Sequence, residues 1–407
     1  MHVFKKDKQY IKFCSYGFLK NLRFFNAFLL LFFLENGISY SEIGVLYALR
    51  EISINIFEIP SGLLADTYGR KNTLLLAFLS YIISFILFYF STDFYWLLLA
   101  MLLFGIGDAF RSGTHKGMIM DYLKIHNWQE YKIAYYGSTR SWSQLGSAIA
   151  ALFAGFLVFY SGNYRLIYLM STIPYVLNFF NILSYPKELN FTLKKEKVTK
   201  SFASVFTNFK EMLRTPKVFR IINSAALYTS FLKVVKDYIQ PIMIQIAVLI
   251  PYFNTIATKK KNGLIIGLLY FGIFLTTSLA SKNAWKISKL KKHNIAKTTL
   301  IIGFVIGAIC GVFIQYEFWF LAFLFFVLIY ILENIRKPIL TGILSDNVPN
   351  EILTSVLSAQ NFYRTILTSV FAILFGFFVN IFGIGISLLI ISSLFLILIR
   401  MKKSAKI

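Results

Sequence analysis

Two apolar segments of the chain each contain an acid that is followed three residues later by an arginine. In the first segment Asp108 and Arg111 are followed by His115, and the spacing i, i+3, i+7 places all three on one face of a continuous helix. Glu333 and Arg336 repeat the acid–arginine spacing in the second segment. Such groups can contact a charged solute or carry a proton. The alternatives are an intrahelical ion pair that neutralises itself and a histidine that is simply packed.

Membrane-spanning helices are the elements that must position these side chains. The 407 residues are 57% hydrophobic, with 44 Phe, 24 Tyr and 15% charged residues, which excludes a soluble globule and a disordered chain. A hydrocarbon core of about 30 Å takes about 20 apolar residues per helix, so the chain has room for about twelve spans and no large soluble domain. We expect spans near residues 14–36, 42–65, 71–91, 95–121, 133–160, 164–185, 219–249, 263–281, 296–315, 318–345, 353–381 and 383–400.

Charged residues inside these segments need a reason, because each costs roughly 2.5–3.5 kcal/mol at a helix centre and therefore faces a partner or water. Eight cations and five acids leave a formal excess of three positive charges (8 − 5), which favours an anionic or zwitterionic solute. Lys233 can pair with Asp237 one turn away, which leaves Lys236 as a candidate anion contact. The cations are Arg23, Arg50, Arg111, Arg140, Lys233, Lys236, Arg336 and Arg364, and the acids are Glu51, Glu58, Asp108, Asp237 and Glu333.

The net charge of +24 lies largely in short lysine-rich segments between the apolar runs, which indicates membrane topology and not nucleic-acid binding. Residues 186–217 are too polar to span and form the expected cytoplasmic linker. They separate an N-terminal six-helix bundle, 1–185, from a C-terminal six-helix bundle, 218–407. The positive-inside rule then places both termini in the cytoplasm. The lysines at 259–261 are the exception, and the ends of the seventh span stay open.

The two halves of the chain resemble each other. The segments GDAFRSGTHKGMIMD and LENIRKPILTGILSD repeat acid, arginine, glycine and acid in the same order. Duplicated six-helix halves are a transporter architecture, with the solute site at the interface between the repeats. The matches at an offset of 225 are Asp108 with Glu333, Arg111 with Arg336, Gly117 with Gly342 and Asp121 with Asp346; an offset of 224 matches Arg140 with Arg364.

Between the second and third expected spans lies the segment GLLADTYGRK. A glycine there permits close helix approach, the acid can cap a helix, and the basic pair favours the cytoplasmic side. The segment resembles the signature loop of the major facilitator superfamily, and with the spans and the repeat the resemblance covers essentially the whole chain. It implies an all-α polytopic protein of twelve transmembrane helices in two pseudo-symmetric bundles. The matching residues are Gly62, Asp66, Gly69, Arg70 and Lys71.

The resemblance also implies a cytoplasmic gate. In that family the loop carboxylate and its basic neighbours join charges at the ends of spans four, five and eleven. The matching residues here are Asp66, Arg70, Asp121 and Arg140, with Asp346 and Arg364 as their symmetry counterparts. The second-half loop SLASKNAWKISKLKK lacks the glycine and the acid, so we expect an asymmetric gate. Alternatively, these charges only anchor helix ends.

These features predict a secondary transporter of a small organic solute that works by alternating access between the two halves. We expect proton coupling, with Asp108, Glu333, Asp237 or His115 as carrier, and an anionic or zwitterionic substrate. A proton-coupled multidrug exporter is the alternative. In the resembled family such exporters usually carry a Gly-Pro element in span five and an arginine early in span four. The fifth span here has no proline, and the expected position of that arginine is near Met101 or Leu102. A channel and a membrane scaffold are more distant alternatives.

An enzyme is not expected. The sequence has no HExxH motif, no Cys/His cluster and no GxxxxGK[ST] loop, so we expect no metal, no cofactor and no ATP hydrolysis. The expected partners are the solute, protons or another coupling ion, and membrane lipid, with no nucleic acid. We expect a monomer in the bacterial inner membrane.

Overall fold

The computed structural model describes residues 6–190, 216–250, 257–288, 295–345, 347–348 and 350–404, and every regular element in them is a helix. The predicted linker 186–217 lies mostly outside the described residues, as does Asp346, and of Asp66 only the backbone is described. By contacts the chain forms two units. Unit 1 contains residues 1–28 and 49–201, and unit 2 contains residues 29–48 and 202–407.

The chain is an all-helical membrane protein. Nine described helices are long and apolar enough to cross a bilayer, or ten when the bent pair Lys8–Ala27 and Leu29–Glu35 counts as one span. The predicted second span is the helix α3 (Tyr40–Thr67), whose charged residues keep it out of that count. The last two predicted spans lie in α15 (Asn350–Ser404), which is interrupted at Gly383, where φ is +77°. The number twelve stays a prediction.

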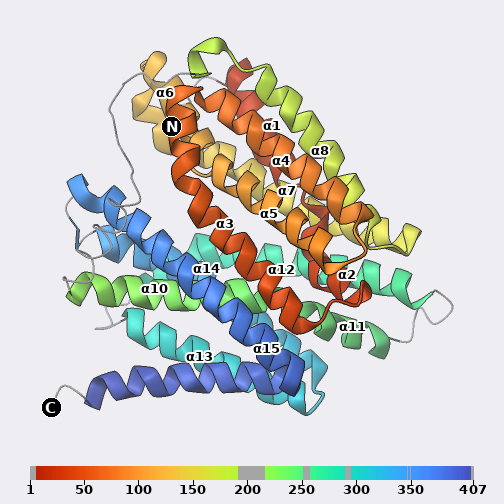
Figure 1. Ribbon diagram of the computed structural model, residues 1–407. Helices are drawn as coiled ribbons and strands as arrows, with labels where there is room; N and C mark the ends of the chain where they lie inside the picture. The colour runs from red at the N-terminus through yellow and green to blue at the C-terminus, as the bar shows by residue number, and fades with distance from the viewer. Residues whose placement is uncertain are drawn as a thin grey trace. The chain divides into compact units, whose positions relative to one another are not determined.

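In unit 1, helix α4 packs against α5 and α8, and α1 packs against α7 and α8 (Figure 1). Asp7 caps α1 by accepting a hydrogen bond from the amide of Tyr10 at 2.8 Å, and Asp93 caps α5 in the same way. The helices are α1 (Lys8–Lys20), α4 (Arg70–Phe90), α5 (Phe94–Arg111), α6 (Thr114–Ile125), α7 (Lys132–Ser161) and α8 (Leu166–Leu183), with the short 3₁₀ turns η1 (Phe24–Ala27), η2 (Gln129–Tyr131) and η3 (Lys187–Asn190).

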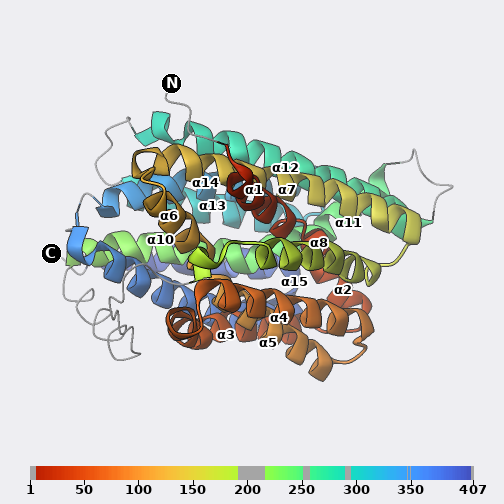
Figure 2. The same cartoon turned by 90° about the horizontal axis from the view of Figure 1, so that it is seen from above.

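In unit 2, α13 packs against α14 and α15, while α10 packs against α15 and α12 against α14 (Figures 1 and 2). Small residues permit close approach: a Cβ on Gly311 would lie 2.6 Å from the carbonyl oxygen of Gly385. The helices are α2 (Leu29–Glu35), the first part of α3, α10 (Pro216–Val235), η4 (Lys236–Tyr238), α11 (Ile239–Leu249), α12 (Thr258–Ser288), α13 (Ile295–Gln315), α14 (Trp319–Ser345) and α15.

One predicted span is broken in a way that matters for the site. The segment 95–121 was expected to be one continuous helix, but it consists of α5 and α6 with a break at Ser112 and Gly113. Gly113 has a φ of +74°, a conformation that glycine adopts without strain. The prediction that Asp108, Arg111 and His115 share one helix face is therefore wrong, because His115 lies on the second helix beyond the break.

Candidate functional site

Asp108 is the centre of a buried charge cluster in unit 1. Its carboxylate accepts hydrogen bonds from the guanidinium groups of Arg50 at 2.7 Å, Arg23 at 3.1 Å and Arg111 at 3.2 Å. The Tyr81 hydroxyl donates a further bond to it at 2.5 Å. The predicted pair of Asp108 with Arg111 is thus present, but two other segments of the chain supply additional arginines.

The elements that supply these groups converge from four parts of the chain. Arg50 comes from α3, Tyr81 from α4, and Arg23 from the turn between α1 and η1. The ring of Phe104 lies beneath two of the guanidinium groups, 5.0 Å from Arg23 and 4.6 Å from Arg50. Such cation–π contacts stabilise cations that have left bulk water.

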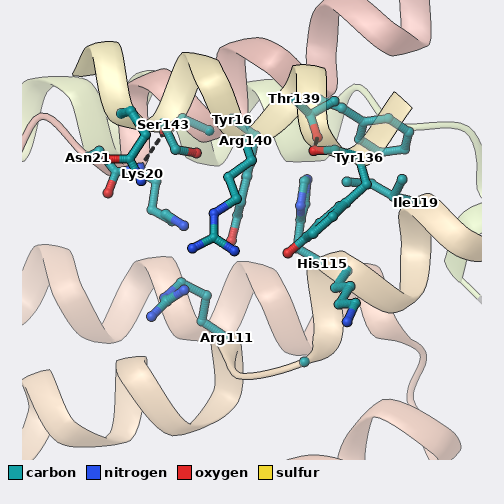
Figure 3. A pocket seen from close by; sticks show the side chains of 15 residues that line it. Tyr16, Lys20, Asn21, Arg111, His115, Ile119, Tyr136, Thr139, Arg140 and Ser143 are labelled. Atoms are coloured by element: carbon teal, nitrogen blue, oxygen red, sulfur yellow. Dashed lines mark hydrogen bonds between the residues drawn. The ribbon is translucent and has the colours of Figure 1, made fainter. Parts of the chain in front are cut away.

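A cavity of about 360 Å³ opens beside this cluster. It is lined by α1, by the end of α5, by α6 and by α7, all within unit 1 (Figure 3). Four of its lining residues are basic, two lysines and two arginines, and none of the lining residues is acidic. The cations are Lys20, Arg111, Lys116 and Arg140.

The cavity cations differ in their partners. Arg111 is shared, since its Nη2 contacts Asp108 and its Nε donates to the Tyr81 hydroxyl at 3.0 Å. Among the residues that the structure describes, no ion pair involves Lys20, Lys116 or Arg140. In Figure 3 the side chains of Lys20 and Arg140 point into the space that Arg111 faces from the other side. Three of the four cations of the lining therefore have no carboxylate partner in the described part of the chain.

His115 lies in the cavity wall in a tight aromatic setting. Its ring stacks on Tyr16 with a centroid separation of 3.5 Å and an interplanar angle of 9°, and Phe13 meets it edge-on. Its Nε2 lies 3.2 Å from the Tyr185 hydroxyl. These contacts fit the packed, hydrogen-bonded alternative, although the ring still lines the cavity.

Part of the predicted gate is brought together where the first turn of α4 meets α6. Arg70 contacts Asp121 at 2.5 Å, and Gly117 makes room for it, because a Cβ there would lie 2.5 Å from Arg70 Nη1. Lys71 donates instead to the carbonyl of Tyr185 at 2.8 Å.

The other gate candidates either lie away from this contact or fall outside the described residues. Arg140 lines the cavity. Gly62 is exposed on α3, and Gly69, with φ of +92°, precedes the first residue of α4. The Arg364 carbonyl accepts bonds from the hydroxyls of Ser230, on α10, and Thr368, one turn further along α15. Gly342 lies exposed on α14. Asp346 and the side chain of Asp66 lie outside the described residues.

The second acid–arginine motif, in unit 2, has a different structure from the first. Arg336 is 1% exposed and donates to the carbonyl and hydroxyl of Ser224, both at 3.0 Å, to the carbonyl of Ala296 at 3.2 Å and to the Thr299 hydroxyl. Glu333 is also buried and accepts a bond at 2.5 Å from Thr229. Within the described part of the chain no ion pair joins the two, so the sequence repeat does not produce a repeated pair.

The seventh predicted span is also broken. Lys236 and Asp237 belong to the 3₁₀ turn η4, between α10 and α11. Asp237 is buried, and the Lys236 carbonyl accepts a bond from Tyr330 at 2.7 Å. Neither residue lines the cavity of unit 1. Among the described residues, no group of three or more His, Cys, Asp or Glu side chains could hold a metal ion.

Comparison with known proteins decides the family. The model of the Major Facilitator Superfamily matches residues 13–372. The chain belongs to the major facilitator superfamily. This membership makes it a membrane transporter and not an enzyme, and it confirms the resemblance that the signature loop carries.

This major facilitator protein is similar to one curated relative and to solved structures of transporters. The uncharacterized MFS-type transporter YxaM of Bacillus subtilis (strain 168) is 31% identical over 104 residues, which is 25% of this chain and 26% of the relative. The nucleoside transporter NupG has a TM-score of 0.74 at 15% identity, with 98% and 99% of the two chains covered. A D-xylose-proton symporter has a TM-score of 0.66 at 14% identity, with 96% and 95% covered. At these identities the solved structures show a shared fold alone.

Several residues that line the cavity of this major facilitator protein were not predicted from the sequence. Lys20 falls inside the first predicted span, so the rule that flagged Arg23 as an intramembrane charge applies equally to it. Lys116 and Tyr136 carried no comparable signal, because each lies near a segment end where a polar side chain is ordinary. Only the break at Gly113 turns α6 so that Lys116 lines the same cavity as Arg111.

Proposed function

We propose that this major facilitator protein is a proton-coupled secondary transporter of a small anionic organic solute, and that the cavity of unit 1 is part of its solute site. The observation that carries the proposal is the lining of that cavity, with four cations and no acid. The two units would open the site alternately to the two sides of the membrane. We place the protein, as a monomer, in the bacterial inner membrane with both termini in the cytoplasm.

The charge of the lining supports an anion over the other solute classes. An entering carboxylate, sulfonate or phosphate is attracted by every cation of the lining, and no acid of the lining repels it. A zwitterion also needs an acceptor for its ammonium group, and none of the lining residues is acidic. The charges of the lining repel a lipophilic cation, which argues against the multidrug exporter.

Proton coupling is assigned to Glu333 in preference to the other predicted carriers. The Asp108 carboxylate is held by three guanidinium groups and a tyrosine hydroxyl, and a proton on it would break those contacts. Glu333 is held by the Thr229 hydroxyl and by no cation at ion-pair distance in the described residues. Protonation of Glu333 therefore breaks fewer contacts than protonation of Asp108.

The contact of Arg70 with Asp121 is proposed as the described part of the cytoplasmic gate. Charge-assisted hydrogen bonds of this kind stabilise one arrangement of two helices by about 1.5–3 kcal/mol. Breaking and remaking it would accompany the switch between the two access states. Anchoring of the helix ends alone remains the second interpretation of the same contact.

The test is a thermal-shift screen of the purified protein in neutral detergent. Benzenesulfonate, L-phenylalanine and tetraphenylphosphonium represent an anion, a zwitterion and a lipophilic cation. We expect only the anion to raise the melting temperature, because a ligand that binds the folded state stabilises it. The shift should disappear in Arg140→Gln and persist in Arg220→Gln, a matched change at an exposed position of α10. Stabilisation by the lipophilic cation alone would overturn the proposal.

A further inference from the structure

The cavity and the Asp108 cluster carry more positive charge than a monovalent anion can match. The cations are the four of the lining together with Arg23 and Arg50. The acids are Asp108 and Glu51, which is buried next to Arg50 in the sequence. Six cations less two acids leave a formal excess of four positive charges. A single negative charge would leave most of this excess unmatched.

We propose that the solute carries a doubly charged phosphomonoester or phosphonate group. This inference rests on the proposed anion transport and narrows it to one chemical class. Arg111 and Arg140 approach the cavity from different helices, α5 and α7, and Lys20 approaches from α1. The fork of a guanidinium group matches two oxygens of such an anion, and an ammonium group adds a point charge. Three different directions of approach suit a tetrahedral group better than a planar carboxylate.

The rest of the lining indicates the organic part of the solute. Phe13, Tyr16 and Tyr136 contribute aromatic surface beside the cations, and Figure 3 shows the hydroxyl of Tyr136 directed toward Arg140. A cavity of about 360 Å³ lies at the small end of the range for ligand sites, roughly 300–1,000 Å³. A compact phosphate ester with one ring is the size that fits.

Phenyl phosphate and phenyl sulfate are a matched pair of probes. They have the same ring and the same tetrahedral group, but at pH 8 the phosphate is a dianion and the sulfate a monoanion. Titration calorimetry on the purified full-length protein should give a dissociation constant at least about tenfold lower for the phosphate, which is about 1.4 kcal/mol. Equal affinities would overturn the dianion inference and leave anion transport standing. Failure of both probes to bind would overturn both proposals.

A variant pair tests whether the extra affinity arises in this cavity. Lys116 and Lys124 are both exposed residues of α6, but only Lys116 lines the cavity. Lys116→Gln should weaken phenyl phosphate more than phenyl sulfate, so that the ratio of their affinities falls severalfold. Lys124→Gln should leave the ratio unchanged. An unchanged ratio in Lys116→Gln, with the melting temperature retained, would contradict the assignment.

Two sources of a phosphomonoester are possible in a membrane, a soluble ester and the headgroup of phosphatidic acid. Dihexanoyl phosphatidic acid, titrated below its micellar concentration, distinguishes them. We expect phenyl phosphate to bind at least as tightly as this short-chain lipid, because the lining encloses a small volume. A lipid that binds tenfold more tightly would overturn a soluble solute as the occupant.

Discussion

Asp108→Asn should destabilise unit 1 strongly, because the substitution removes the charge and keeps the shape. Three guanidinium groups, whose side chains are 13%, 22% and 25% exposed, would then surround a neutral amide. Breaking a buried ion pair from one side costs about 3–5 kcal/mol, and partial exposure of the arginines places the loss near 3 kcal/mol. At about 2–4 °C per kcal/mol for a unit of this size, the melting temperature should fall by roughly 6–12 °C.

The assay is thermal unfolding of the purified protein in detergent at fixed pH, with Asp93→Asn as the matched control. Asp93 caps the same helix, α5, and asparagine caps a helix about as well as aspartate, so this control should melt close to the wild type. A second control adds Arg50→Gln to the Asp108→Asn protein, which should recover part of the loss by removing one unmatched cation. If Asp108→Asn melts within about 2 °C of the wild type, the account of Asp108 as the organiser of the cluster is refuted.

Two further predictions concern the gate and the coupling. Gly117→Ala should displace Arg70 from Asp121 and cost about 1–3 kcal/mol in an otherwise wild-type protein, but little when Asp121→Asn is already present. Equal losses of thermal stability in the two backgrounds would contradict the gate contact. Glu333→Gln should abolish solute uptake driven by a pH gradient into proteoliposomes and retain exchange of solute between the two sides. Uptake at the wild-type rate would show that the proton moves elsewhere.

The fold could be predicted because the bilayer imposes strong rules on composition. Apolar runs, lysine-rich connections and the signature loop together predicted helices whose ranges agree closely with those observed. The exact points where helices break could not be predicted in this way. Gly113 is one glycine among 23, and nothing in the sequence distinguishes it from those that continue a helix.

The partners of the site residues were harder to predict than the residues themselves. Spacing along one helix predicted the pair of Asp108 with Arg111, but Arg23, from the turn before η1, and Arg50, from α3, reach the same carboxylate. The identical spacing in unit 2 gave no pair, because Arg336 meets hydroxyls and carbonyls from α10 and α13 instead. Contacts between helices depend on packing, and a pattern within one segment carries no information about them.

Counterflow across proteoliposome membranes tests the central claim most directly, because it requires a carrier and is independent of the driving ion. Vesicles loaded with an unlabelled aryl phosphate, sulfonate or carboxylate would be diluted into a trace of the same labelled anion. The account predicts transient, saturable accumulation of label in wild-type vesicles, its loss in the double variant Lys20→Gln and Arg140→Gln, and its retention in Arg220→Gln. Accumulation of labelled lipophilic cations but of no anion, or undiminished anion exchange in the double variant, would contradict it.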